Sequence, residues 1–149
     1  MPTRDDIVTE ARTWLGTPFG HQGRTKGFEV DCVNLEAEVG LATGAVPDIE
    51  FEKTYRRRSD GETMVQLFEQ YLDPIEWREA LPADVLVIRY SKSQWHCMII
   101  SKVEGTEITV IEAGMGRTSK QPEMVTEHRI DWSTKRRIHS AYRVRNLSD

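Results

Sequence analysis

Two residues that could carry out nucleophilic catalysis stand far apart in this chain: Cys32, directly after Asp31, and His96 in a strand-like run. A glycine-rich, turn-forming stretch over residues 16–23 precedes the pair, and an apolar helical pattern follows it. A cysteine in the first turn of a helix feels the partial positive charge of the helix end, which lowers the pKa of its thiol. Because the thiolate is the attacking form, this layout predicts a cysteine nucleophile with a distant base.

The second cysteine, Cys97, directly follows the histidine. Successive side chains of a strand point to opposite faces, so His96 and Met98 share one face and Cys97 points to the other. We therefore interpret Cys97 as a small buried hydrophobe in a central strand. Cys32 remains the candidate nucleophile.

A carboxylate, Glu112, is the candidate third member of the site. A three-residue loop over 103–105, with its glycine in the left-handed conformation, would pair Lys102 with Thr106. In that register His96 lies directly opposite Glu112, where cross-strand Cβ atoms are about 4.5–5.5 Å apart. Glu112 would then orient the imidazole and leave its other nitrogen free to take the thiol proton. Taken singly, a core histidine and an exposed strand carboxylate are the alternatives.

Helices are expected in the first half of the chain. Thr3 is suited to cap the first helix, with Asp6 at the capping-box position, and Gly16 and Pro18 end it. Its apolar stripe consists of Ile7, Val8, Ala11, Trp14 and Leu15. Asp31 is suited to cap a second helix, which continues to Gly40 or Gly44. A third helix carries Met64, Leu67, Phe68 and Tyr71, and Pro74 closes that segment.

Strands are expected in the second half, where the hydrophobic period changes to two. The predicted strands are 85–88, 95–103, 106–113, 125–130 and 138–144. Helices followed by an antiparallel sheet indicate an α+β fold, and 149 residues suit one domain spanning 1–149.

Composition excludes several classes of protein. The chain is 38% hydrophobic and 30% charged, with a net charge of -4, and it lacks the basic excess of a nucleic-acid-binding protein. The basic clusters at 56–58 and 135–137 are interpreted as solvated faces. No stretch is apolar enough to insert into a membrane, and no signal peptide is recognisable. Two cysteines in unlike contexts suggest free thiols, and without a paired Cys-x-x-Cys spacing we expect no metal site.

Several motifs together resemble the NlpC/P60 family of cell-wall peptidases, most closely its phage-associated branch. The likeness extends over nearly the whole chain, including the order and spacing of the parts. The residues that carry it are Ala11 to Phe19, His21-Gln22-Gly23, Val30-Asp31-Cys32-Val33, Pro82 to Val87, and Trp95-His96.

The resemblance implies a papain-like α+β fold, with N-terminal helices packed on an antiparallel β-sheet. The family hydrolyses amide bonds in peptidoglycan stem peptides, typically from γ-D-glutamate to a diamino acid. By position, Cys32 is the nucleophile, His96 the general base and acid, and Glu112 the orienting residue. No metal or organic cofactor is implied.

The resemblance also suggests residues that contact the substrate. Asp31 matches a family position that helps to hold the stem peptide, although a plain helix N-cap is the alternative. Phe19 stands where a tyrosine is usual, so the missing polar contact would come from His21 or Gln22. Trp95 would form a wall of the cleft or part of the core.

Three further positions depart from the family pattern. Val33 replaces a common serine, Asn34 a common glycine, and Glu112 occupies a place more often held by histidine. The changes at Phe19, Val33 and Asn34 leave open a catalytically decayed structural tail-tip component with the same fold, although the intact Cys32, His96 and Glu112 argue against it. An acyltransferase using the same thiol is a third possibility. His128 and His139 match no motif, and we assign them core or surface roles.

Family context suggests where such a protein would act. Without a signal peptide, it would be made in the cytoplasm and assembled into a virion or tail-like particle, of prophage or gene transfer agent origin. Its expected partners are the peptidoglycan stem peptide and phage tail or tail-tip proteins. It would act in the periplasm or at the cell wall.

Overall fold

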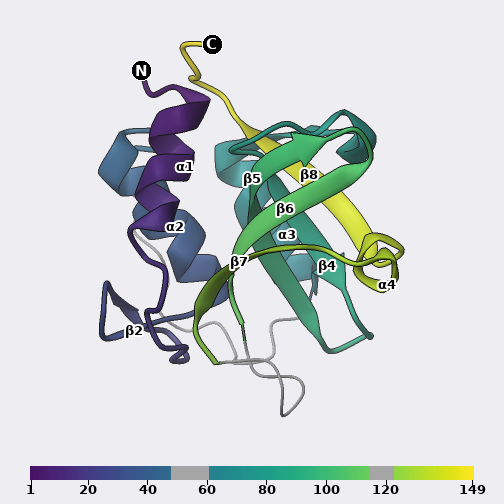
Figure 1. Ribbon diagram of the computed structural model, residues 1–149, viewed down its shortest axis with the longest axis horizontal. Helices are drawn as coiled ribbons and strands as arrows, with labels where there is room; N and C mark the ends of the chain where they lie inside the picture. The colour runs from purple at the N-terminus through teal and green to yellow at the C-terminus, as the bar shows by residue number, and fades with distance from the viewer. Residues whose placement is uncertain (48–60, 115–122) are drawn as a thin grey trace.

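The computed structural model describes residues 1–47, 61–114 and 123–149. Helices α1 (Arg4–Arg12) and α2 (Cys32–Thr43) lie side by side next to an antiparallel sheet, and α3 (Gly61–Tyr71) packs near the sheet's β3 end (Figure 1). The basic cluster predicted at 56–58 lies outside the described residues.

The sheet has six strands in the order β3-β8-β4-β5-β6-β7, and every neighbouring pair is antiparallel. Its strands are β3 (Leu72–Ile75), β4 (Val85–Arg89), β5 (Trp95–Glu104), β6 (Glu107–Ala113), β7 (Val125–Arg129) and β8 (Ile138–Val144). Short elements complete the fold: β1 (Arg24–Thr25), β2 (Glu29–Val30), the 3-10 helix η1 (Trp77–Glu79) and α4 (Trp132–Lys135). The predicted α+β class is confirmed.

Helix α1 begins as predicted. The Thr3 side chain accepts from the Asp6 backbone N–H at 3.0 Å, and the Asp6 carboxylate accepts from the Thr3 N–H at 2.9 Å, which forms a capping box. The predicted stripe is buried except at Leu15, which is 42% exposed. Helix α1 ends at Arg12, so Leu15 falls in the following turn and no longer shares the helical face.

Helix α2 also matches its prediction at both ends. The Asp31 carboxylate accepts from the Asn34 N–H, and Gly44 adopts the left-handed conformation with φ of 75° at the C-cap. Helix α3 ends at Tyr71, before Pro74, as predicted. The chain then continues directly into β3, which was not predicted; it is an edge strand, where a proline is tolerated because its missing N–H can face outward.

The β5–β6 hairpin is shifted relative to the predicted register. Glu104 pairs with Glu107 across a two-residue turn, and an irregularity between Ile100 and Lys102 shifts the register once more. Ile99 therefore pairs with Ile111, whereas the predicted register would have paired it with Thr109. The turn glycine, Gly105, is in the left-handed region as expected, with φ of 61°. On the Ile99 side of the irregularity the shift is two residues, which leaves the side chains there, Glu112 included, on their predicted faces.

Two apolar layers cover the faces of the sheet. Cys97 and Ile99 belong to clusters on the side of α1, α2 and α3, whereas Met98 and Ile100 belong to a cluster on the opposite side. The first layer positions α2 across β5, because residues of both elements pack together there.

A buried carboxylate joins the N-terminal helix to the sheet. Asp84 is fully buried and accepts from Arg4 Nη1 at 3.0 Å and from Arg143 Nη2 at 2.8 Å. Segments next to these two arginines in sequence are also in contact. The Ser148 N–H donates to the Pro2 carbonyl at 3.0 Å.

Candidate active site

Asp31 organises the start of α2 and the glycine-rich loop before it. Its Oδ1 accepts from the Asn34 N–H at 2.9 Å, and its Oδ2 accepts from the Gln22 N–H at 2.7 Å. Gln22 has a positive φ of 62°, a conformation unusual for a residue with a side chain. The carboxylate therefore holds a strained loop residue as well as capping the helix.

Asn34 fastens the same loop to α2. Its Nδ2 donates to the Gly23 carbonyl at 3.1 Å, and the Asp31 N–H donates to the same carbonyl at 3.4 Å. A Cβ on Gly23 would lie 2.8 Å from the Glu29 carbonyl carbon, so only glycine fits. Asn34, which replaces a common family glycine, thus has a structural role of its own.

Strands β5 and β6 diverge where the candidate catalytic residues lie. Strand β5 pairs with β4 as far as Trp95, but its pairing with β6 ends at Ile99 and Ile111. In the continued register Glu112 lies diagonal to His96 and not opposite it, which corrects the prediction. The diagonal pair still meets: His96 Nε2 and Glu112 Oε1 are 2.8 Å apart, and both side chains are buried.

Cys32, the first residue of α2, reaches His96 from the helix. Since Nε2 of His96 is bound by Glu112, Nδ1 is the nitrogen available to the sulfur. Burial alone would lower the pKa of His96, but its hydrogen bonds with Cys32 and Glu112 outweigh burial and raise the pKa to about 10. Hydrogen bonds from Cys97 and from His96 hold the pKa of Cys32 well below its ordinary value, despite burial. Both shifts favour a thiolate–imidazolium pair over a neutral thiol and imidazole.

Glu112 has a second histidine partner that sequence reasoning missed. His128 Nε2 lies 2.5 Å from Glu112 Oε2, and His128 Nδ1 lies 3.0 Å from the Arg129 carbonyl. Burial tends to raise the pKa of Glu112, but the hydrogen bonds from His128 and His96 lower it far below its usual range. The sequence contains no signal for this contact, because the β6–β7 register depends on a long connection between the strands.

Cys97 also has a contact that the alternation pattern could not reveal. It is buried among Val33, Val85 and Val87, as expected of a small hydrophobe. Because α2 crosses this face of the sheet, the thiol and backbone N–H of Cys97 hydrogen-bond to Cys32. Burial, followed by the proximity of Cys32, raises the pKa of the Cys97 thiol. Of the two sulfurs, Cys32 carries the charge because it also faces His96 and the helix end.

The predicted substrate-contacting residues lie in different settings. Phe19 packs partly against the cluster beneath α1, and its N–H donates to the Glu123 carbonyl at 2.8 Å. His21 is half-buried and the Gln22 side chain is exposed. Trp95 is half-buried beside Gly61, where an added Cβ would come within 1.9 Å of its indole ring.

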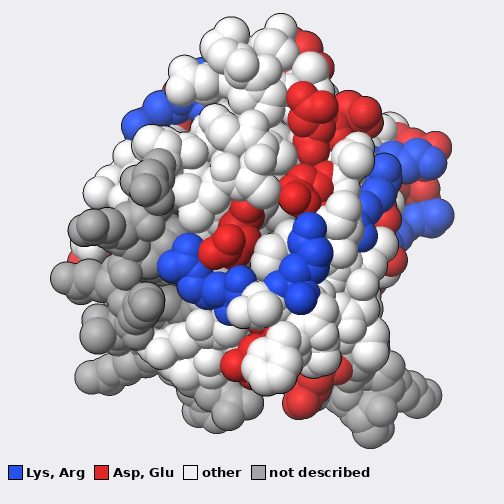
Figure 2. All heavy atoms as spheres, turned by 90° about the vertical axis from the view of Figure 1, so that its left-hand side faces the viewer, with Lys and Arg blue, Asp and Glu red and all other residues white. Residues whose placement is uncertain are grey.

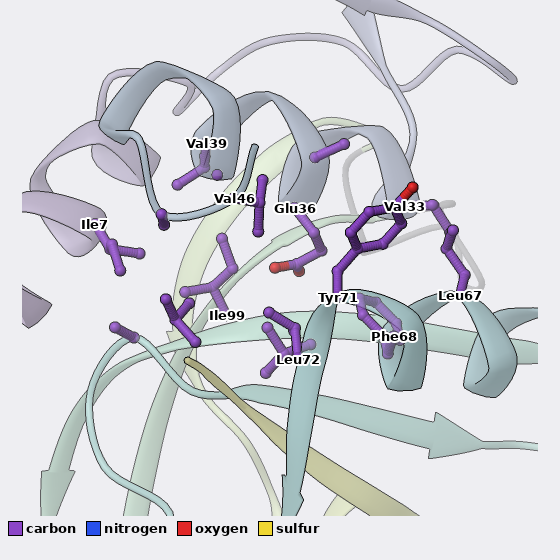
Figure 3. Close-up of a pocket in the computed structure, with 16 residues that line it drawn as sticks. Ile7, Val33, Glu36, Val39, Val46, Leu67, Phe68, Tyr71, Leu72 and Ile99 are labelled. Carbon is purple, nitrogen blue, oxygen red and sulfur yellow. The ribbon is translucent and has the colours of Figure 1, made fainter. Parts of the chain in front are cut away.

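An apolar pocket lies behind the nucleophile, between α2, α3 and the sheet (Figure 3). It encloses about 560 Å³, open solvent at its mouth included. Glu36, one helical turn after Cys32, points into it, and its enclosed Oε1 has no hydrogen-bond partner among the residues that the structure describes. Burial, and then the nearby Cys32 charge, raises the pKa of Glu36 well above its ordinary value.

On the face seen in Figure 2, acidic and basic side chains are intermingled. Within residues 1–47, 61–114 and 123–149, no cluster of three His, Cys, Asp or Glu residues is arranged to hold a metal ion. No helix among the same residues is long and apolar enough to span a membrane.

Several solved structures resemble the fold of this chain over nearly its whole length. The NlpC/p60 domain of the peptidoglycan hydrolase SagA matches with a TM-score of 0.62 and 22% identity, over 95% of this chain and 98% of that domain. The chain has the NlpC/P60 fold. An NlpC/P60 family protein from Bacillus cereus matches equally well, with a TM-score of 0.62 and 15% identity, over 96% of this chain but 40% of that protein.

Two further solved structures match the chain at lower sequence identity. The endolysin LysIME-EF1 matches with a TM-score of 0.61 and 12% identity, over 96% of this chain and 64% of that one. Ly7917, solved with the hydrolysis product of MDP, matches with a TM-score of 0.56 and 13% identity, over 95% of this chain and 63% of that one. No protein-family model and no curated protein sequence matches the chain.

Proposed function

We propose that this chain is a cysteine peptidase that hydrolyses amide bonds in peptidoglycan stem peptides, with the γ-D-glutamyl–diamino acid link as its target. The observation that carries the proposal is the buried array of Cys32, His96 and Glu112, on a helix N-terminus and two neighbouring strands. The NlpC/P60 fold, shared with a peptidoglycan hydrolase domain, supports the substrate class.

The array suits acyl transfer to a thiol. The Cys32 thiolate attacks the scissile carbonyl, and the Cys32 backbone N–H with a second nearby donor would stabilise the oxyanion. The His96 imidazolium then donates its proton to the leaving amine. In the second half of the reaction neutral His96 takes a proton from water, which hydrolyses the thioester. Glu112 holds the imidazole in orientation throughout.

Asp31, next to Cys32 in sequence, and Trp95, next to His96, are two of the proposed substrate contacts. The Asp31 carboxylate accepts from the Gln22 and Asn34 N–H groups beside the nucleophile. In the proposed complex it would also accept from a substrate ammonium. The half-buried Trp95 ring, adjacent to His96, would form the apolar wall, and His21, Gln22 and Phe19 would line the loop side.

A phage tail or tail-like particle is the proposed setting. The endolysin named among the structural neighbours supports a connection with phage lysis chemistry, and tail or tail-tip proteins would be the partners. In that setting the protein would reach peptidoglycan in the periplasm or at the cell wall.

The test is release of free amines from purified peptidoglycan by wild type and by Cys32→Ala, with far-ultraviolet circular dichroism to show that both are folded. We expect release by wild type and loss of it in the variant, by roughly 10³-fold or more, because the nucleophile is removed. Equal, null release from both would support the structural tail-tip alternative. Product that forms only when an amine acceptor is added would identify an acyltransferase.

A further inference from the structure

Cys97 is a buried nucleophilic group that the proposed peptidase mechanism does not use. It lies in the middle of the sheet on β5, 1% exposed, while Cys32 is 9% exposed at the start of α2. Both cysteines are free, both belong to the same buried cluster, in which α2 and α3 pack on the sheet, and each shifts the pKa of the other. A core cysteine that served only to fill space would have no need to face the reactive sulfur.

The two thiols differ in character, as an attacking and a resolving cysteine do. Cys32 faces His96 and the positive end of α2, which favour its thiolate. Cys97 lies among Val85 and Val87, and its apolar surroundings keep it as a thiol. Low-pKa cysteines next to a second thiol are the typical sites of reversible oxidation.

We propose that Cys32 and Cys97 form a redox pair, in which a hydroperoxide oxidises Cys32 and Cys97 resolves the product as an intrachain disulfide. This inference depends on the contact between the thiols and not on peptidase activity. Its consequence is a nucleophile that oxidation blocks reversibly and that Cys97 protects from irreversible damage.

The chemistry balances with the groups present and a hydroperoxide. The Cys32 sulfur attacks the terminal peroxide oxygen, so an S–O bond forms while the O–O bond breaks, and the departing alkoxide or hydroxide takes the His96 proton. The Cys97 sulfur then attacks the Cys32 sulfenic acid. An S–S bond forms, the S–O bond breaks, and the hydroxide leaves as water with the Cys97 proton. Each sulfur is oxidised by one electron, and the peroxide is reduced by two.

Hydrogen peroxide and intact-mass spectrometry test the proposal directly. Wild type is treated with equimolar peroxide and quenched with an alkylating agent under denaturing conditions. Its intact mass is then measured. We expect a species about 2 Da lighter that takes up no alkyl group, yields a cross-linked peptide with both cysteines, and reverts with dithiothreitol. Non-reducing electrophoresis should show a monomer.

Cys97→Ala is the matched control, with Cys97→Ser as a second variant if alanine does not fold. Without the resolving thiol, and with two or more equivalents of peroxide given to both proteins, Cys32 should instead gain about 32 Da as sulfinic acid, which dithiothreitol does not reverse. The proposal is overturned if wild type gains oxygen at the rate of Cys97→Ala, if both thiols remain alkylatable, or if the disulfide joins two chains. Because mass is the readout, failure of the peptidase proposal would leave this test intact.

Discussion

At the scale of single residues, proton placement decides what the site can do. His96 has one nitrogen on the Glu112 carboxylate and the other directed at Cys32, so the folded protein stabilises both the imidazolium and the thiolate. Glu112 is itself held by His128 through its second oxygen. A chain of four side chains therefore sets the charge state of the nucleophile.

Glu112→Gln should shift the pH dependence of amine release. In wild type, activity should persist through neutral pH and fall as His96 loses its proton, with its pKa raised to about 10. The amide no longer stabilises the imidazolium, so the alkaline limb should move to lower pH and kcat should fall by roughly 10²-fold or more. An alkaline limb at the wild-type position would show that Glu112 does not act through His96.

The Cys32–His96 pair also predicts a plateau in stability against pH. The raised pKa of His96 contributes stability below its ordinary value of 6.5 that is lost as pH rises through about 10. The lowered pKa of Cys32 contributes stability above its ordinary value of 9.0 that is lost as pH falls. Between 6.5 and 9.0 the folded and unfolded pairs each hold one proton, so the two slopes cancel.

Urea unfolding compares wild type with a Cys32→Ser/His96→Asn double variant, both in a Glu36→Gln background, because the Cys32 charge also shifts the pKa of Glu36. The difference in unfolding free energy should be flat between 6.5 and 9.0 and should fall on either side. A difference that changes steadily across that interval would mean that the pair is a neutral thiol and imidazole.

At the scale of elements, α2 carries an ionisable group into an apolar pocket. Glu36 is held one turn from the thiolate with an enclosed oxygen that lacks a partner, so the folded protein favours its protonated form. An acid with a raised pKa loses stability as pH rises from its ordinary value, here 4.5, towards the folded value. Glu36 therefore lowers the free energy of unfolding by an amount that increases with pH.

Glu36→Leu should stabilise the protein by about 1–3 kcal/mol near neutral pH, the usual cost of burying an unsatisfied polar group. Glu36→Gln, which keeps the polar oxygen but removes the ionisation, should give a smaller gain that appears only as pH rises above 4.5. Thermal melts of the three proteins across this range measure both effects. Destabilisation by both substitutions at all pH values would mean that Glu36 has a partner that stabilises the fold.

At the scale of the whole molecule, Asp84 connects segments from both ends of the chain. It receives hydrogen bonds from Arg4 of α1 and Arg143 of β8, and it lies immediately before β4. Because this carboxylate is fully buried, its loss would leave two arginines without their counter-charge. The contact helps to hold α1 against the sheet. Because α1 packs against α2, it also helps to position the helix that carries Cys32.

Asp84→Ala should lower the free energy of unfolding by about 3–5 kcal/mol, as expected when one partner of a buried ion pair is removed. Asp73→Ala is the matched control, since its bond to Arg145 is exposed and surface pairs contribute about 0–1 kcal/mol. Urea unfolding measures both variants. Similar small losses in the two would show that Asp84 contributes no more than a surface pair.

Much of the local structure could be predicted from the sequence. The caps at Thr3 and Asp31, the left-handed Gly44 and the strand pattern from residue 85 onward depend on short-range hydrogen bonding and side-chain periodicity. Parity also placed Glu112 on the face of His96. The predicted face was correct although the predicted turn was wrong. The register next to Glu112 differs from the prediction by two residues, and side chains two residues apart in a strand share a face.

Tertiary structure alone decided the contacts that complete the site. The turn length and the irregularity near Ile100 made Glu112 a diagonal partner of His96, and the β6–β7 register brought in His128. The path of α2 across the sheet placed Cys32 against Cys97, although strand parity had separated Cys97 from His96. Periodicity reports the face on which a side chain lies, whereas the packing of distant segments decides what lies against that face.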